Sequence, residues 1–235
     1  MSEILKINNL WSGYKDGVDI LRGISMEVQR GETVGIIGLN GSGKSTFGKA
    51  IMNMIPIRKG EIFFEGKDIT SLTTSQLAHR GISIMQQGGK VFPNLSVWDN
   101  LQLATQANNC QLSILNSQLA EIIPLLQQPK KKLQHLMADK LSGGQKHQLS
   151  LAMTLAANPR LVILDEPSAG LSPKAVEEMY AILRNVRNIF GVSIVLIEQN
   201  IAKAVSFSNL GYLLRQGVLS DSIDNIDNIN KEIFK

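Results

Sequence analysis

The sequence predicts an α/β fold with a mainly parallel sheet in its core, an N-terminal antiparallel β part and an inserted helical subdomain. Strand-sized apolar segments alternate with helical segments through much of the chain, an order typical of parallel sheets. Two of these segments, Leu161–Leu164 and Ile194–Ile197, are continuous apolar runs, as in strands that are covered on both faces. Between about Ser96 and Lys140 the pattern is instead helical, polar and rich in glutamine, which indicates the insertion.

The first third of the chain is predicted to consist mostly of strands and turns. Strands are expected at Ile4–Leu10, Ile20–Gln29 and Thr33–Ile37. The third of these leads directly into a glycine-rich loop and a helix from Lys44 to about Met54, which Pro56 ends. A short strand pair, Glu61–Glu65 and Gly81–Met85, follows. Glycines and a proline then interrupt regular structure before the helical insertion begins.

The part of the chain after the insertion alternates helices and strands. A helix is expected at Gln145–Ala157. Its predicted inner face consists of Leu149, Ala152, Met153 and Ala156. The next helix has clear ends, since Ser172 can cap it, Pro173 suits its first position and Gly191 suits its C-terminal side. Strands are expected before and after that helix, at Leu161–Leu164 and Ser193–Ile197.

The composition is that of a folded protein without a nucleic-acid surface. At 235 residues the chain can form one large domain or two closely packed subdomains. Its formal net charge of +4 is modest, and the cationic run Lys130–Lys132 is interpreted as a solvated helix end. The single Cys110 cannot form an internal disulfide and favours a reducing compartment. His79, His135 and His147 lack metal-ligand spacing, so ordinary surface or packing roles are expected.

Neither a signal peptide nor a membrane-spanning segment is expected. The N-terminus lacks an apolar core, and no apolar run approaches the roughly 20 residues that cross a bilayer. Any membrane role is therefore expected to come through a partner. The Asp/Asn/Ile-rich tail Asp221–Asn230 is interpreted as a variable surface end.

A glycine-rich loop after the strand Thr33–Ile37 is the first candidate site. The run from Gly38 to Thr46 fits G-x-x-x-x-G-K-[ST] in its strand–loop–helix context. Glycines let backbone N–H groups turn toward phosphate oxygens, and the helix N-terminus adds positive potential. Lys44 is expected at the β- and γ-phosphates, and the Ser45 hydroxyl at Mg²⁺. The expected nucleotide-binding residues here are Gly38, Asn40, Gly41, Ser42, Gly43, Lys44, Ser45 and Thr46.

The apolar run Leu161–Leu164 ends in two carboxylates, Asp165 and Glu166. Two acids at the end of a buried strand would be unfavourable unless a cationic group lies there. Asp165 is expected to hold Mg²⁺ through a water, and Glu166 to orient and polarise the attacking water. This is placement and charge stabilisation, as in phosphoryl transfer, rather than covalent chemistry.

A third element, the signature turn Leu141–Gln145, lies between the other two in the sequence. Ser142 and the amides of Gly143 and Gly144, at the start of the helix of Gln145, offer donors to an anion, although Ser-Gly-Gly is also good helix-capping material. With this LSGGQ run, the chain resembles the ATP-binding cassette (ABC) ATPases from about Leu5 to Leu219. The resemblance implies one ABC domain, with residues 1–86 and 158–235 forming a RecA-like core with the β part and residues 87–157 the helical subdomain.

The resemblance also implies that ATP and Mg²⁺ bind between two subunits. In the family, the signature turn (Ser142, Gly143, Gly144 and Gln145 here) contacts the γ-phosphate held by the opposite subunit. Tyr14 is similar in place to an aromatic that stacks on adenine, or is an ordinary packing residue. Gln87 matches a glutamine that senses Mg²⁺ and the attacking water, with Gln86 as an adjacent competitor. The loop Ser168–Ser172 matches one that crosses the dimer interface, but Ser172 stands where Asp is usual.

Gln199 departs from the family pattern, because most members place there a histidine that contacts the γ-phosphate. The Glu-Gln-Asn run that contains Gln199, and the segment Gln87–Val97, resemble the shorter ATPase subunit of branched-chain amino-acid importers, with urea importers as close relatives. That subunit pairs with a longer paralogous ATPase. A neutral amide donates a weaker hydrogen bond to a charged phosphate than imidazolium does, so the two ATP sites are expected to be unequal.

The resemblance therefore implies the ATP-hydrolysing motor of an importer at the cytoplasmic face of the membrane. Expected partners are a second ABC ATPase subunit (a longer paralogue, otherwise a second copy), permease subunits and, indirectly, a substrate-binding protein. Val91, Phe92, Leu95 and Trp98 either contact a permease helix or pack locally. Alternatives are a urea importer, a lipid or lipopolysaccharide exporter, and a soluble ABC ATPase. A small GTPase is set aside because no Asn-Lys-x-Asp run occurs.

Overall fold

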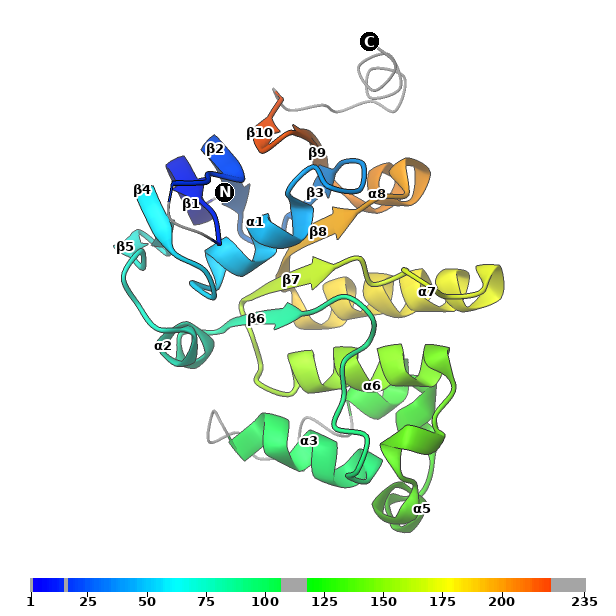
Figure 1. Ribbon diagram of the computed structural model, residues 1–235. Coiled ribbons are helices and arrows are strands. Elements are labelled where there is room, and N and C mark those ends of the chain that lie inside the picture. Colours follow the sequence, from blue (N-terminus) through cyan, green and yellow to red (C-terminus); the bar gives the residue numbers. More distant parts are fainter. Residues whose placement is uncertain (1, 15–16, 107–117, 221–235) are drawn as a thin grey trace.

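The computed structural model describes residues 2–14, 17–106 and 118–220. Cys110 and the predicted surface tail Asp221–Asn230 lie outside this part of the chain, so the interpretations made for them are not tested. The described strands form an antiparallel and a mainly parallel sheet, with helices around and below the second one (Figure 1).

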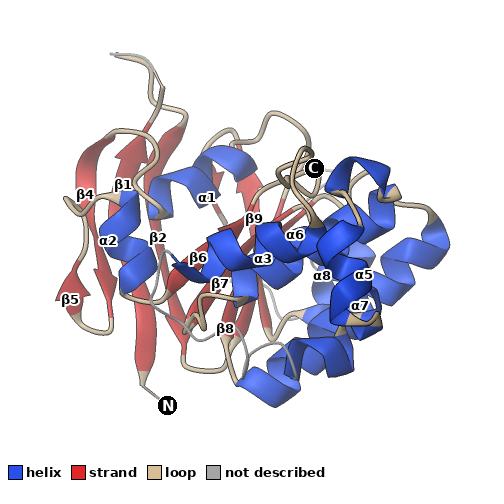
Figure 2. Ribbon diagram, turned by 90° about the horizontal axis from the view of Figure 1, so that it is seen from below, coloured by secondary structure: helices blue, strands red, loops and turns tan. Residues whose placement is uncertain are grey.

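The antiparallel sheet contains the N-terminal strand. It has the order β2-β1-β4-β5 and lies at one end of the molecule, away from α5 and α7 (Figure 2). Its strands are β1 (Glu3–Ser12), β2 (Leu21–Gln29), β4 (Ile57–Phe64) and β5 (Lys67–Asp68). Buried and exposed positions alternate along β2, as expected for a sheet with one face on the core. The predicted antiparallel β part is therefore present in the structure.

The second sheet has the order β10-β9-β3-β8-β7-β6. Its strands are β3 (Thr33–Ile37), β6 (Ile82–Met85), β7 (Leu161–Asp165), β8 (Ser193–Glu198), β9 (Leu210–Arg215) and β10 (Val218–Leu219). Five strands, β9, β3, β8, β7 and β6, pair with one another in parallel, and β10 pairs antiparallel with β9. The predicted mainly parallel sheet is confirmed.

The expected strand pair Glu61–Glu65 and Gly81–Met85 is wrong as a pair. The first segment belongs to β4, which pairs with β1, whereas the second belongs to β6, which pairs in parallel with β7. The strand β4 also starts earlier than expected, at Ile57. The two segments are close in sequence, but β4 pairs with β1 and the short β5, whereas β6 pairs with the distant β7. The pairing of β4 with β1 and of β6 with β7 is not encoded in local residue patterns.

Four helices accompany the core. They are α1 (Lys44–Ile51), α2 (Thr74–His79), α7 (Pro173–Phe190) and α8 (Ile201–Phe207). The helix α1 ends at Ile51 rather than near Met54, because Asn53 takes a positive φ of 49°. The side-chain amide of Asn53 donates hydrogen bonds to the backbone carbonyls of Ile69 and Leu72. These two bonds hold this end of the helix.

The inserted segment is helical where the structure describes it. It contains α3 (Val97–Gln106), the 3₁₀ turn Pro124–Gln127, α5 (Lys130–His135), the 3₁₀ turn Ala138–Lys140 and α6 (Gly143–Leu155). These elements lie together below the parallel sheet (Figure 1). The helix α6 starts at Gly143 rather than Gln145, and Met153 is only partly buried. The division of the chain into a core and a helical subdomain stays a prediction.

The parallel sheet separates two hydrophobic clusters. Val162 and Leu164 of β7 pack with the helical segment and α7, whereas Leu161 and Ile163 pack with α1 and the antiparallel sheet. Neighbouring side chains of a strand point to opposite faces, so a strand covered on both sides is apolar throughout. This explains the uninterrupted apolar run that predicted β7.

Candidate nucleotide-binding and catalytic site

The candidate site lies at the carboxyl edge of the parallel sheet. The strand β8 pairs with β3 on one side and with β7 on the other, so Glu198 lies opposite Ile37 and Ile197 lies opposite Asp165. The loop after β3, the acidic end of β7 and Gln199 after β8 therefore meet at one edge. Such an edge is where α/β sheets bind their ligands.

The loop after β3 (Gly38–Gly43), called the phosphate loop below, wraps around the N-terminus of α1. Gly41 and Gly43 have φ values of 80° and 106°, in the left-handed region that other residues adopt only with strain. The Lys44 side chain is buried at the start of α1. Its Nζ lies 3.2 Å from Glu166 Oε1 and 3.1 Å from the Leu39 carbonyl oxygen. The cationic group that was expected near the two acids is therefore Lys44.

The other polar side chains expected at this edge also meet there. Ser45 Oγ donates a hydrogen bond to Asp165 Oδ1 at 3.2 Å, and Gln87 Nε2 donates one to Glu166 Oε2 at 2.6 Å. The structure thus brings Gln87 to the acidic pair, while Gln86 accepts a hydrogen bond from Lys90 instead. Burial raises the pKa of the Asp165 carboxyl above its usual value, and the hydrogen bond from Ser45 opposes this shift.

A cavity of about 360 Å³ opens between these groups. Its lining residues are Ile20, Asn40, Gly41, Gly43, Lys44, Ser45, Thr46, Gln87 and Glu166. A lysine, backbone amides and a helix N-terminus suit a phosphate chain. The Ser45 hydroxyl and the Asp165 carboxylate are hard oxygen ligands beside it, which is the donor set that Mg²⁺ prefers. Asp165 and Ser45 therefore fit a magnesium ion.

Tyr14 lies at the surface beyond the end of β1. Half of the residue is exposed, and its hydroxyl is 3.2 Å from the Nζ of Lys49, which also lies 5.4 Å from the ring centre. The ring is accessible to a planar ligand, so an ordinary core-packing role does not describe it. Contact with adenine stays a prediction.

The signature turn forms a capping box at the start of α6. Ser142 Oγ accepts a hydrogen bond from the Gln145 amide at 3.3 Å, and Gln145 Oε1 accepts one from the Ser142 amide at 3.0 Å. Ser142, Gly143 and Gln145 are nonetheless exposed. None of these described residues lines the cavity beside Lys44. The turn therefore presents its donors outward rather than to the phosphate loop of its own chain.

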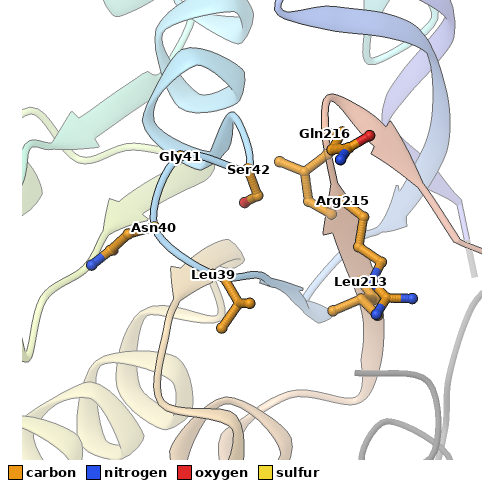
Figure 3. Close-up of a pocket in the computed structure, with 8 residues that line it drawn as sticks. Leu39, Asn40, Gly41, Ser42, Leu213, Arg215 and Gln216 are labelled. Carbon is orange, nitrogen blue, oxygen red and sulfur yellow. The ribbon is translucent and has the colours of Figure 1, made fainter. Parts of the chain in front are cut away.

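A second cavity, of about 520 Å³, lies behind the phosphate loop (Figure 3). Leu39 and Ser42 lie across it from the end of β9 and from Gln216, which follows β9. The turn after β9 supports the loop, because the Gly217 amide donates a hydrogen bond to the Ser42 carbonyl at 2.9 Å. The strands β9 and β10 were not among the strands predicted from the sequence, so this support was not predicted either.

His147 of α6 joins the inserted helices to the site. It is buried, and its Nδ1 lies 2.8 Å from the carbonyl oxygen of Pro167, next to Glu166. A Cβ on Gly89 would come within 2.5 Å of its ring, so a glycine is required where the loop after Gln87 passes. The expected packing role for His147 is consistent with this position, although its closeness to the acidic pair was not predicted from the sequence.

Comparison with known proteins agrees with this geometry. The family model for the ABC transporter matches residues 21–169. A branched-chain amino acid transport ATP-binding protein, BraG of Pseudomonas aeruginosa, is 31% identical over 88% of this chain and 87% of its own length. LivF of Archaeoglobus fulgidus, a probable protein of the same kind, is 31% identical over 91% of this chain and 89% of its own length. The lipopolysaccharide export ATP-binding protein LptB of Escherichia coli K12 is also 31% identical, over 92% and 88%.

Solved structures show the same fold. A nucleotide-free ATP-binding cassette from an ABC transporter matches with a TM-score of 0.83 and 24% identity, over 100% of this chain and 96% of that one. None of the helices in the part of the chain that the structure describes is both long and apolar enough to cross a bilayer. The motifs, the architecture and the relatives agree: this chain belongs to the ABC transporter family and is one of its ATPases.

Proposed function

We propose that this chain is the shorter ATPase subunit of a branched-chain amino-acid importer. The observation that carries the ATPase site is the meeting of Lys44, Gln87 and Glu166 around one cavity. The substrate rests on the Glu198–Asn200 run, which resembles that subunit, and on the relatives BraG and LivF.

ATP binding must rearrange the site that the structure shows. In the structure, the buried Lys44 forms an ion pair with Glu166. When the γ-phosphate takes that place at Lys44, Glu166 is released and can accept a hydrogen bond from the attacking water. Gln87 already contacts Glu166, so its amide would move with that carboxylate. Nucleotide binding and placement of the water are thus linked through one ion pair.

Mg²⁺ would be held by the Ser45 hydroxyl and, through a water, by Asp165. When bound, it supplies charge neutralisation on the phosphate oxygens. The chain itself supplies the rest: the turn of Gly41 and Gly43 binds phosphate, and Lys44 fixes its position. Tyr14 would stack on the adenine at the exposed edge of the same site.

We further infer that ATP is held between two cassette subunits. Within one chain the signature turn is exposed and lies outside the cavity of the phosphate loop, so its donors are available to a nucleotide held by another subunit. One of the structural relatives is a dimeric cassette bound to ADP and phosphate. The second subunit would be the longer paralogue, or otherwise a second copy of this chain.

Gln199 makes the site of this chain the weaker of the two. Its neutral amide donates a hydrogen bond without adding positive charge, and the difference is about 1 kcal/mol for a charged phosphate. Gln199→His should raise the ATP turnover of the assembled complex severalfold, and Gln199→Ala should lower it. Full transporter-level turnover by this chain alone, unaffected by Gln199→Ala, would contradict the proposed asymmetry.

A groove of about 340 Å³ between the core and the inserted helices suits a permease segment. It runs from Met54 past Gln86 and Lys90 to Met153. A helix seated there would contact the loop that carries Gln87, which makes it a direct route from the membrane partner to the acidic pair. We propose that an amphipathic cytoplasmic helix of the permease occupies it, and that the complete subunit lies at the cytoplasmic face.

Of the four apolar residues considered for this contact, Val91, Leu95 and Trp98 are partly buried and Phe92 is exposed. Val91 and Trp98 pack against the helical cluster, and Lys130 lies 4.3 Å from the Trp98 ring centre. Phe92 is 53% exposed and stays a candidate contact. Met54→Asp should therefore abolish capture of the chain by its permease, Phe92→Asp should weaken it, and Val218→Asp on the remote β10 should not. Equal capture of all three variants would exclude this surface.

Lipopolysaccharide export is the second candidate, because LptB is as similar to this chain as BraG is. Cells that carry Glu166→Gln should lose uptake of labelled leucine, isoleucine and valine. Loss of urea uptake alone would instead identify a urea importer. Normal uptake of all four, with a defect in the outer membrane, would identify the exporter. Genes for permeases and a secreted binding protein beside the gene would favour import.

A further inference from the structure

Glu198 is a buried acid that the proposed reaction does not use. It is the last residue of β8, and the whole strand is buried, with Glu198 itself 2% exposed. Its backbone lies opposite Ile37, one residue before the phosphate loop begins. A charge at this depth is unfavourable unless it is fully hydrogen-bonded, so its partners define what it does.

The carboxylate accepts hydrogen bonds from two side chains on one oxygen and two backbone amides on the other. Ser168 Oγ donates to Oε1 at 2.7 Å, and the Tyr180 hydroxyl donates to the same oxygen at 3.0 Å. The Gln199 amide donates to Oε2 at 3.2 Å, and the Asn200 amide lies at 3.5 Å. All four donors are uncharged. The carboxylate thus connects three segments: the loop of Ser168, the helix α7 of Tyr180, and the backbone after β8.

Tyr180 connects the Glu198 carboxylate to the helices α7 and α8. It is buried in α7, and its ring packs edge-on against Phe207 of α8 with ring centres 5.6 Å apart. Burial, together with the adjacent Glu198 carboxylate, raises the pKa of the Tyr180 phenol far above its usual value. The hydroxyl therefore keeps its proton and remains a donor.

Ser168 belongs to the loop that begins at the catalytic carboxylate. The Ala169 amide donates a hydrogen bond to the Glu166 carbonyl at 3.1 Å, and the Glu166 amide donates one to the Ile197 carbonyl at 2.9 Å. One oxygen of Glu198 therefore holds the loop after Glu166, and the other holds the backbone of Gln199. Both segments lead to groups that the proposed reaction requires.

We propose that Glu198 is a positioning residue. It couples the position of the Gln199 backbone to the position of the Ser168–Ser172 loop. The inference deepens the proposed ATPase mechanism and rests on it, but it does not depend on the transported substrate. A displacement of Ser168 would be passed through a single carboxylate to the amides of Gln199 and Asn200. Movement of the loop when subunits meet would thus change the donor offered to the γ-phosphate.

Hydrogen–deuterium exchange of the purified chain tests the connection without requiring turnover. Ser168→Ala should speed exchange of the Gln199 and Asn200 amides roughly tenfold, although Ser168 touches neither, because the Glu198 carboxylate loses its shortest hydrogen bond. Glu198→Gln keeps the size but places an N–H₂ where an acceptor is needed, so it should speed exchange in both loops. Asn188→Ala, an exposed position near the far end of α7, is the control and should leave both unchanged. Exchange confined to the altered loop in each variant would overturn the proposal.

Steady-state kinetics of the assembled transporter provide the second readout. Ser168→Ala and Glu198→Gln should each lower kcat about 10- to 100-fold with the KM for ATP within about twofold, since misplacement affects the reacting geometry. The double variant should be no slower than the slower single variant. Multiplicative losses would show that the two residues act separately and would refute the connection. An inactive wild-type complex would contradict the proposed function, while the exchange result would still decide the role of Glu198.

Discussion

At the scale of single residues, a buried ion pair lies where we propose that the γ-phosphate of ATP binds. Lys44 and Glu166 are both nearly inaccessible and 3.2 Å apart. Removing one partner of such a pair leaves the other charge buried and uncompensated. This ion pair therefore predicts how substitution of either residue changes both ATP affinity and turnover.

Glu166→Gln should lower ATP turnover by roughly 10²- to 10⁴-fold, the contribution of a positioned general base. It should also strengthen ATP binding, because Lys44 no longer has a carboxylate partner that competes with phosphate. Thermal unfolding with and without ATP measures this: the rise in Tm on adding ATP should exceed that of the wild type by several degrees. Lys44→Ala, the matched control, should show almost no rise. An unchanged ATP effect in Glu166→Gln would contradict competition at Lys44.

Asp165→Asn should stabilise the nucleotide-free chain while abolishing Mg²⁺-dependent turnover. Burial raises the folded-state pKa of Asp165 above its unfolded value, so the ionised carboxylate costs stability at neutral pH. The variant should therefore have a higher free energy of unfolding than the wild type at pH 7. The gain should shrink as pH falls through the folded pKa and vanish below about 4, where the acid is protonated in both states. Urea unfolding across this range measures it, and a gain that grew toward acid pH would contradict the assignment.

At the scale of elements, local residue patterns predicted the ends of helices but not the pairing of strands that are distant in sequence. The ends of α7 were predictable, because Ser172 caps its first turn and Gly191 takes a φ of 60° at its end. The pairing of β4 with β1 and of β6 with β7 was not, because these partners lie far along the chain. The phosphate loop follows from spacing within nine residues, whereas the donors to Glu198 come from positions 30 and 18 residues away.

Gly191→Ala should destabilise the fold by about 1–2 kcal/mol, the cost of a Cβ in the left-handed region. A Cβ at this position would meet nothing within 4 Å, so the cost is one of backbone conformation and not of crowding. Urea unfolding measures the loss, and ATP turnover should stay at the wild-type level. Asn188→Ala, exposed in the same helix, should cost nothing. Equal effects of both variants would contradict the cap assignment.

At the scale of the whole molecule, the fold separates the two segments that we propose to bind ATP. The phosphate loop lies at the carboxyl edge of the parallel sheet, and the signature turn lies on the inserted helices with its donors outward. The residues of both were predictable from sequence. The family resemblance implied that they serve different subunits, and in the structure the signature turn does not line the cavity beside Lys44. The central claim, that ATP is sandwiched between two cassettes, follows from this separation.

Sedimentation of the Glu166→Gln chain with Mg²⁺ and ATP, alone and mixed with its longer paralogue, tests that claim most directly. The mass should rise to that of two cassettes only when ATP is present. Gly143→Asp should prevent the rise, because it places a negative charge at the signature turn where a Cβ meets nothing within 4 Å in the free chain. A chain that stays monomeric with every partner supplied, yet still binds and fully shields ATP, would contradict the account.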